Sequence, residues 1–363
     1  NNTTQDRRDP APAGSRPPDA CDGKRSSGMK VCIIGMGPIG NTHARVYKSI
    51  PEVELIGVCD RIEERARQAG RQYGAAWYLD AQQMLDDLKP DLVSVSTGGF
   101  EYSSDHYEPT LQALEAGAHV LCEKPICNDL VKAEEMVQTA RKRGLCLAVD
   151  LNHRFTPAAR AAKQWQDDGR VGELLFINMN LWIGRSGEFE TEFYHLKALN
   201  PHSVDIVRYF GGDVAEVQCF AMKASGRNLY STQSMNLRMA NGAVGHITSS
   251  YDIKRGHPME RCEVAGTKGR LIVDDMWREA TLYPADELIK QVYTNPVFGG
   301  FTGFYDTFAD RISTYVKELL AGVKPEDIDG SGQAGLEASR VIHAAIESIR
   351  RGGQPVLVAE VSR

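Results

Sequence analysis

Three stretches of the 363-residue sequence combine residue types and spacings that can do chemistry. The first is the turn Gly35-Met36-Gly37-Pro38-Ile39-Gly40, which lies between an apolar run and a helical pattern. In such a turn the first glycine permits a tight bend, the second admits a pyrophosphate, and the third lets the helix pack closely. Free N–H groups at the helix start then face the phosphates. The whole turn, Pro38 and Ile39 included, is predicted to bind a dinucleotide.

An acidic residue in the right place supports this prediction. Asp60 ends the next apolar run, 20 residues after Gly40, where a carboxylate can accept hydrogen bonds from the adenosine ribose hydroxyls. A carboxylate there repels a 2′-phosphate, which favours NAD. Arg61 can either stack on adenine or accept that phosphate, so NADP remains an alternative.

The second stretch is Glu123-Lys124-Pro125, which follows the predicted strand 118–122. Ligands of doubly wound folds lie beyond the carboxyl ends of the strands, so Lys124 is expected at the cofactor crevice. A partly desolvated lysine has a lowered pKa and can exchange a proton with a substrate hydroxyl. On chemistry alone, a solvated surface charge is the competing interpretation.

The third stretch is Pro201-His202-Ser203-Val204-Asp205, in a predicted helix over residues 201–210. A histidine can take the proton of a hydroxyl group while hydride leaves the same carbon. His202 is therefore the second catalytic candidate.

The glycine turn, Asp60, A-G-A-H-V-L-C-E-K-P at 116–125 and N-H-R-F at 152–155 occur in this order. Together they resemble the glucose–fructose oxidoreductase, inositol dehydrogenase and rhizopine catabolism family (Gfo/Idh/MocA), over residues 29–360. The resemblance implies a Rossmann domain, an open C-terminal α/β domain, and NAD(P)-dependent oxidation or reduction of sugars, cyclitols or their derivatives.

The resemblance also implies roles for single residues. Lys124 matches the catalytic lysine of the family. Positions implied to line the cofactor are Thr97, His106, Glu123, Lys124, Asn152 and Arg154. Arg154 is also expected to border the substrate. For His106 and His153, capping or packing is an equally good interpretation.

Two segments depart from the family pattern. The motif D-x-G-x-H-x-x-D keeps His202 and Asp205 but has Ala198 and Asn200 at its first two fixed positions. The missing carboxylate removes a substrate anchor, and a nearby side chain is expected to fill its space. The candidates are Tyr194, His195 and Lys197, of which Tyr194 and His195 are expected to contact substrate. The loop 98–105 is longer than the family's usual turn.

Two architectures must position these residues. Strands alternate with helices over residues 30–149, which predicts a doubly wound parallel sheet. Beyond it, alternating strands predict a mostly antiparallel sheet with helices on one face. The predicted strands are 173–183, 214–222, 229–239, 243–253, 259–265, 269–273 and 280–284. We expect a dinucleotide domain over 29–150 and a substrate and oligomerisation domain over 151–363, with the free sheet face forming a homodimer or homotetramer.

Composition excludes several other classes. The net charge of −6 argues against nucleic-acid binding, and no apolar run approaches a membrane span. The eight cysteines form no C-x-x-C pair, which indicates buried thiols in a reducing, cytoplasmic compartment, and no metal-ligand spacing occurs. Residues 1–28 are rich in Pro, Gly, Ser and charge, so they are predicted to be a disordered tail.

The sequence thus predicts a dehydrogenase acting on a secondary alcohol of a sugar, glycoside or cyclitol. Two alternatives stay open. One is an NAD-dependent glycosidase, in which transient oxidation drives elimination. The other is a sensor that binds dinucleotide without turnover, which the retention of Lys124 and His202 disfavours.

Overall fold

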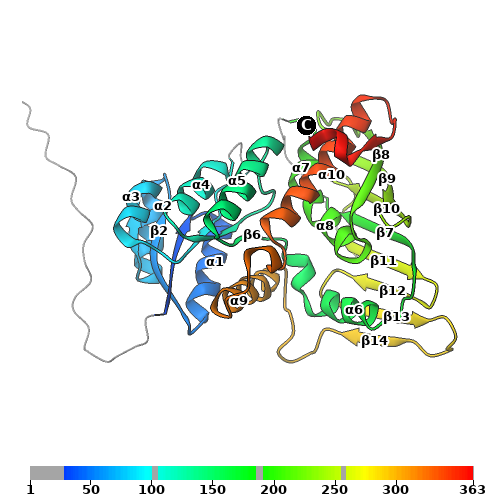
Figure 1. The fold of residues 1–363 in the computed structure, drawn as a ribbon, viewed down its shortest axis with the longest axis horizontal. Coiled ribbons are helices and arrows are strands. Elements are labelled where there is room, and N and C mark those ends of the chain that lie inside the picture. Colours follow the sequence, from blue (N-terminus) through cyan, green and yellow to red (C-terminus); the bar gives the residue numbers. More distant parts are fainter. Residues whose placement is uncertain (1–27, 100–104, 185–190, 255–258, 363) are drawn as a thin grey trace, which may run out of the picture.

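The computed structural model describes residues 28–99, 105–184, 191–254 and 259–362, in two sheet-based domains (Figure 1). The first sheet has six parallel strands in the order β3-β2-β1-β4-β5-β6. Its strands are β1 (Met29–Ile34), β2 (Val53–Cys59), β3 (Ala76–Tyr78), β4 (Leu92–Val95), β5 (His119–Cys122) and β6 (Leu147–Val149). The helices between them are α1 (Pro38–Ser49), α2 (Glu63–Tyr73), α3 (Ala81–Leu88), α4 (Tyr107–Glu115) and α5 (Leu130–Arg143). The predicted doubly wound parallel sheet is confirmed.

Strand order determines where this domain can bind a ligand. The chain runs outward through β2 and β3, then returns to the other side of β1 with β4. The loops after β1 and β4 therefore diverge and open a crevice at the carboxyl edge of the sheet. β4 is buried along its whole length, as expected for a strand covered by helices on both faces.

The second sheet has nine strands in the order β14-β13-β12-β11-β7-β10-β9-β8-β15. They are β7 (Leu174–Trp182), β8 (Val214–Met222), β9 (Thr232–Met239), β10 (Val244–Ser250), β11 (Glu260–Gly266), β12 (Gly269–Asp274), β13 (Glu279–Pro284), β14 (Gln291–Thr294) and β15 (Val356–Leu357). Among the described strands of this second sheet, only β7 and β10 pair in parallel. The prediction of a mostly antiparallel sheet is therefore confirmed.

Helices pack on one face of this sheet. They are α6 (Pro157–Asp167), α7 (Tyr194–Ala198), α8 (Asn200–Gly211) and α10 (Gly332–Arg350). Along β7, Ile177, Met179 and Leu181 are buried beneath the helices, while Asn178 and Asn180 on the other face are only half-buried. The described helices leave that second face of the sheet open, as the alternation predicts.

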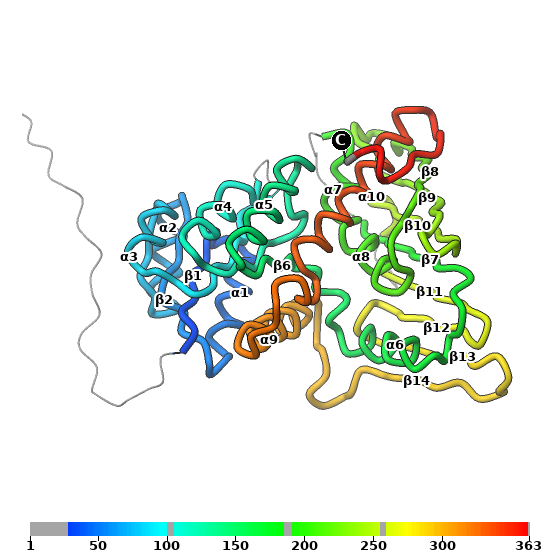
Figure 2. Tube along the Cα trace, in the orientation of Figure 1, coloured from blue at the N-terminus to red at the C-terminus, as the bar shows by residue number. Residues whose placement is uncertain are grey.

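The end of the chain returns to the first domain. Helix α9 (Asp306–Leu320) packs beside α1, as Figures 1 and 2 both show. Its Phe308, Ile312 and Tyr315 share a hydrophobic core with β1. Short 3₁₀ turns complete the fold: η2 (Asn152–Phe155), η3 (Pro325–Asp327) and η4 (Val358–Ser362).

The predictions of buried thiols and of a disordered tail can be compared with the structure only in part. The seven described cysteines are all free and buried, whereas Cys21 and nearly all of the predicted tail over residues 1–28 lie outside the described residues. Within the described ranges, no helix is long and apolar enough to cross a membrane.

Candidate active site

The glycine turn after β1 has three glycines with three different surroundings. Gly35 has φ of +96°, and a Cβ there would lie 2.6 Å from the backbone of Ser96. A Cβ on Gly40 would lie 1.8 Å from the Gly35 carbonyl oxygen, so this glycine lets α1 pack against the turn. A Cβ on Gly37 would meet no atom within 4 Å. Gly37 is therefore not required by the protein's own packing, as expected where a ligand's phosphates approach the backbone.

The start of α1 suits an anion. Gly37 is its N-cap, with no side-chain cap and no acidic residue in the first turn. Side chains cap α3, α5, α6 and α10, from Asp80, Asp129, Thr156 and Ser331, whereas α2, α4, α7, α8 and α9 have no side-chain cap, like α1. Because the first N–H groups of a helix need a partner, a pyrophosphate fits this uncapped end.

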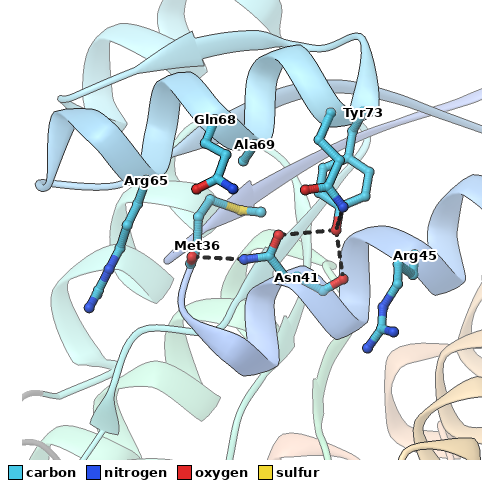
Figure 3. Close-up of a pocket in the computed structure, with 8 residues that line it drawn as sticks. Met36, Asn41, Arg45, Arg65, Gln68, Ala69 and Tyr73 are labelled. Carbon is cyan, nitrogen blue, oxygen red and sulfur yellow. Dashed lines mark hydrogen bonds between the residues drawn. The ribbon is translucent and has the colours of Figure 1, made fainter.

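Side chains hold the turn in shape. Asp60 accepts hydrogen bonds from the Met36 and Ile62 N–H groups, at 2.8 Å each, which directs its carboxylate toward the turn. The Asn41 amide donates to the Met36 carbonyl at 2.9 Å, and the Tyr73 hydroxyl donates to Asn41. Met36, Asn41 and Tyr73 border a cavity of about 310 Å³ between α1 and α2 (Figure 3). Arg61 lies exposed beside Asp60.

The loop after β4 meets the loop after β5 through His106. Its Nδ1 lies 2.7 Å from the Pro125 carbonyl oxygen and its Nε2 lies 3.2 Å from that of Thr97. Both ring nitrogens thus contact backbone, and His106 is buried. The histidine connects the Thr97 loop to the E-K-P loop, which gives it a packing role. Most of the enlarged loop 98–105 lies outside the described residues.

Lys124 reaches across to the second domain. Its Nζ donates a hydrogen bond to the Ala198 carbonyl oxygen at 3.0 Å. Ala198 stands where the family has its aspartate, so a backbone carbonyl at this position holds the lysine. This contact brings the carboxyl edge of β5 against the junction of α7 and α8.

His202, at the start of α8, lies at the same junction. Its ring stacks on His153 of η2, with 4.0 Å between ring centroids and 9° between planes. Burial, followed by the charges of His153 and Lys124, holds the pKa of His202 well below its usual value. His202 is therefore a neutral imidazole at neutral pH, which is the form that accepts a proton.

Arg154 is engaged by acidic side chains. Its guanidinium forms a bidentate ion pair with Asp205 of α8 and a further contact of 2.9 Å with Asp329. The neighbouring Asn152 donates to the Thr307 hydroxyl at 2.6 Å. Both residues connect η2 to the helices around it, and their expected places beside the nicotinamide and the substrate stay predictions.

His195 and Lys197, two of the side chains expected to fill the space of the missing aspartate, contact other parts of the protein. His195 stacks on Tyr251 at 4.0 Å, and burial lowers its pKa to about 3. The Lys197 amine donates to the Asn128 carbonyl at 3.4 Å, toward α5. Tyr194 is buried in a cluster with Ala198 and Tyr251. The expected substrate contacts of Tyr194 and His195 stay predictions, and the Ala198 backbone carbonyl contacts Lys124 at the position of the family's aspartate.

A second polar cluster lies beneath the E-K-P loop. His43 of α1 has its Nε2 at 3.1 Å from Glu123 and 3.2 Å from Asp150, and its Nδ1 at 2.7 Å from the Ser94 hydroxyl. Burial lowers the pKa of His43, but the two carboxylates outweigh burial and raise it to about 9. The three side chains have the spacing of metal ligands.

The structure thus joins Lys124 to the Ala198 carbonyl, just before the helix that carries His202, and places the glycine turn, Asp60, Thr97 and Glu123 along the same carboxyl edge. Three residues had no part in the predicted site: His43, Asp150 and Glu260, whose Oε2 lies 2.9 Å from the Nδ1 of His153. Asp150 directly follows β6, so the rule for carboxyl ends of parallel strands was a usable signal. His43 and Glu260 sit inside α1 and β11, where sequence pattern alone indicates packing.

Comparisons with known proteins agree with this geometry. The family profile described as "Oxidoreductase family, NAD-binding Rossmann fold" (GFO_IDH_MocA) matches residues 29–151, and that of the GFO/IDH/MocA C-terminal domain matches residues 159–272. Together the two profiles span more than half of the sequence. The chain belongs to the Gfo/Idh/MocA family of oxidoreductases, which confirms the resemblance.

Relatives differ in how much of the chain they match. D-glucoside 3-dehydrogenase of Escherichia coli (strain K12) is 41% identical over 151 residues, which are 41% of this chain and 42% of that protein. Myo-inositol 2-dehydrogenase of Thermotoga maritima is 25% identical over 338 residues, covering 88% of this chain and 96% of that protein. A levoglucosan dehydrogenase solved with NADH and levoglucosan has a TM-score of 0.81 at 20% identity, covering 91% of this chain and 99% of that one. This last likeness shows the fold.

Proposed function

We propose that this protein is an NAD-dependent dehydrogenase that moves a hydride between nicotinamide and a secondary alcohol or ketone of a sugar, glycoside or cyclitol. The observation that carries the proposal is the hydrogen bond from Lys124 to the Ala198 carbonyl, which joins the carboxyl edge of β5, on the sheet that carries the glycine turn, to the segment before His202. The names of the inositol and glucoside dehydrogenase relatives support the substrate class.

The cofactor, when bound, accepts the hydride that leaves the carbinol carbon. The hydroxyl proton of the same carbon must go to a base as the C=O bond forms. His202 is neutral and can accept it, while Lys124, held by the Ala198 carbonyl, can polarise the oxygen. The reverse assignment uses the same two residues. In the ketone-reducing direction, whichever of these two residues carries the proton donates it to the oxygen that becomes the hydroxyl group.

Replacement of Lys124 tests the proposal. Lys124→Ala should lower turnover by about 10²- to 10⁴-fold, the usual contribution of a general acid or base. It should still bind NADH, because the turn and Asp60 are unchanged. Lys142→Ala, an exposed lysine at the end of α5, is the matched control. Near-normal turnover of Lys124→Ala, with NADH titration and melting temperature unchanged, overturns the assignment.

A panel of sugars, glycosides and cyclitols, assayed with NAD and NADP, identifies the substrate. The expected result is reduced nicotinamide formed in proportion to substrate oxidised. Release of an aglycone without net NADH would instead indicate a glycosidase. Cofactor binding without turnover of any compound would indicate a sensor.

We also propose a homo-oligomer formed through the open face of the second sheet, in a reducing, cytoplasmic compartment. The open face and the seven free, buried thiols support these two proposals. Light scattering on the purified protein should give the mass of a dimer or tetramer. The mass of a 40.0 kDa monomer at micromolar concentration would contradict the assembly.

A further inference from the structure

A buried amide lies at the start of α8, two residues after Ala198. Asn200 is fully buried, and its side chain forms hydrogen bonds at both ends of the amide. Its Nδ2 donates to the His195 carbonyl oxygen at 3.3 Å, and its Oδ1 accepts from the Ser249 hydroxyl at 3.0 Å. Because a buried polar side chain is costly unless its groups are paired, these two bonds define where Asn200 can lie.

The series of hydrogen bonds continues into the second sheet. Gln233 of β9 and Ser249 of β10 are directly opposite each other, and the Gln233 amide donates to the Ser249 hydroxyl. Each side chain donates to the next along the series, which ends at the His195 carbonyl. Hydrogen bonds that run in one direction through a buried region strengthen one another. The sheet therefore fixes the end of α7.

The series ends on the piece of chain that holds Lys124. Helix α7 has five residues, and the Leu199 N–H donates to the same His195 carbonyl at 3.2 Å. Ala198 closes this helix, and its carbonyl accepts from the Lys124 Nζ at 3.0 Å. A helix this short has little stability of its own, so its bonds to the sheet determine where the Ala198 carbonyl lies.

We propose that Asn200 is a positioning residue for Lys124, because it fixes the backbone carbonyl that holds the lysine amine. Ser249 and Gln233 support Asn200 from the sheet. This inference rests on the proposed catalytic role of Lys124 and adds residues that act only through it. The family motif has glycine at position 200, which could form neither bond, so the departures at Ala198 and Asn200 work together.

Chemical labelling of lysine amines tests this without substrate or cofactor. The intact chain is acetylated with a trace of acetic anhydride, and mass spectrometry gives the rate at Lys124 relative to that at exposed Lys142. Asn200→Ala removes both bonds of the amide and allows the Ala198 carbonyl to move. The rate at Lys124 should then rise about three- to tenfold, as expected when a hydrogen bond to a charged group is weakened.

Gln166→Ala is the matched control, since the Gln166 amide donates to the Phe210 carbonyl at 2.8 Å, near the other end of α8. It removes the same kind of bond from the same helix and should leave the Lys124 rate unchanged. Should Asn200→Ala fail to fold, Ser249→Ala breaks the same series with the loss of one hydroxyl group and should give the same rise. An unchanged Lys124 rate in the folded variant, or an equal rise in Gln166→Ala, overturns the positioning role.

Turnover separates this inference from the proposed function. Asn200→Ala should lower kcat about tenfold with NADH affinity unchanged, but should cause no further loss in Lys124→Ala, because it acts through that lysine. An equal loss in both backgrounds overturns the inference. Near-normal turnover of Lys124→Ala would instead overturn the proposed function, and the labelling rates would still decide whether Asn200 holds Lys124 in place.

Discussion

Within the glycine turn, Gly40 is required by the packing of the protein, whereas Gly37 is expected to serve cofactor binding. A Cβ on Gly40 would collide with the Gly35 carbonyl oxygen, whereas a Cβ on Gly37 would meet nothing of the protein. Gly37 also has φ of −71°, which alanine adopts without strain. The two positions, three residues apart, therefore offer a matched pair of substitutions.

Gly37→Ala should leave the melting temperature nearly unchanged but weaken NADH binding about tenfold or more, because the methyl group occupies the space that the pyrophosphate needs. Gly40→Ala should lower both stability and binding, since α1 must move away from the turn. Thermal melts and fluorescence titration with NADH measure the two effects. Unchanged NADH affinity in Gly37→Ala would mean that the cofactor does not approach this turn.

We expect the charge of Asp60 to set the cofactor preference. Asp60→Asn keeps an oxygen that can accept from the Met36 N–H but removes the charge that repels a 2′-phosphate. The ratio of kcat/KM for NADP over NAD should rise about tenfold, equivalent to about 1.4 kcal/mol. Steady-state kinetics with both cofactors measure it, with exposed Asp86→Asn as control. A ratio that stays constant in a folded variant contradicts a carboxylate facing the ribose.

At the scale of elements, the His43 cluster joins α1 to the ends of β5 and β6. His43, Glu123 and Asp150 come from these three elements and are buried. The His43 pKa in the folded protein is about 9, above its ordinary 6.5. Its stabilising effect is therefore complete below pH 6.5 and is lost as the pH rises through about 9.

We therefore expect the urea midpoint of the wild-type protein to fall between pH 6.5 and about 9. The accompanying loss of unfolding free energy is at most about 1.4 kcal/mol per pH unit. His43→Gln should be less stable and should lack this slope. His119→Gln is the control, because burial lowers the pKa of His119 and moves its titration away from this window. Parallel pH curves for wild type and His43→Gln would disprove a protonated His43.

Elements with a strong local signal were predictable, and those defined by their neighbours were not. The alternation of strands and helices in the first domain follows from apolar runs and from glycine and proline signals, and the strand predicted over 118–122 is observed as His119–Cys122. The edge strand Gln291–Thr294 is largely exposed, so no apolar run reveals it. The two-residue strand Val356–Leu357 exists only because it pairs with β8.

The same division applies to the site. The glycine turn and Asp60 act through local backbone geometry, which residue types and spacing encode. The partner of Lys124 is a backbone carbonyl 74 residues away, so the side chain of Ala198 carries no signal for it. His153 and Glu260 are brought together only by the packing of η2 on β11.

At the scale of the whole molecule, the last two long helices connect the domains. Helix α10 begins against the first sheet, where a Cβ on Gly335 would lie 2.6 Å from Val149. Further along, its Val341 and Ala345 pack in the core of the second domain. Helix α9 lies against α1, where its Tyr315 hydroxyl contacts the Val120 and Cys146 carbonyls of the first domain. The two domains therefore share helices, and we expect them to unfold together.

Arg311 of α9 offers a way to measure this coupling. It is fully buried, donates hydrogen bonds to the Val149 and Gly330 carbonyls, and its charge lies close to Asp150. Arg311→Ala leaves these acceptors and the carboxylate of Asp150 without that cation, which should cost about 3 kcal/mol or more. Exposed Arg143→Ala, at the end of α5, is the control and should change stability little.

The positions of the tryptophans make it possible to tell whether the two domains unfold together or independently. Three of the four, Trp165, Trp182 and Trp277, belong to the second domain, so tryptophan fluorescence mainly reports its unfolding. Far-UV circular dichroism reports both domains. Because α9 and α10 pack on both sides, Arg311→Ala should shift the two signals to the same lower urea concentration. A fluorescence transition that stays at its wild-type midpoint while the circular dichroism splits would mean that the second domain is stable alone, and that α10 does not transmit the loss at Arg311.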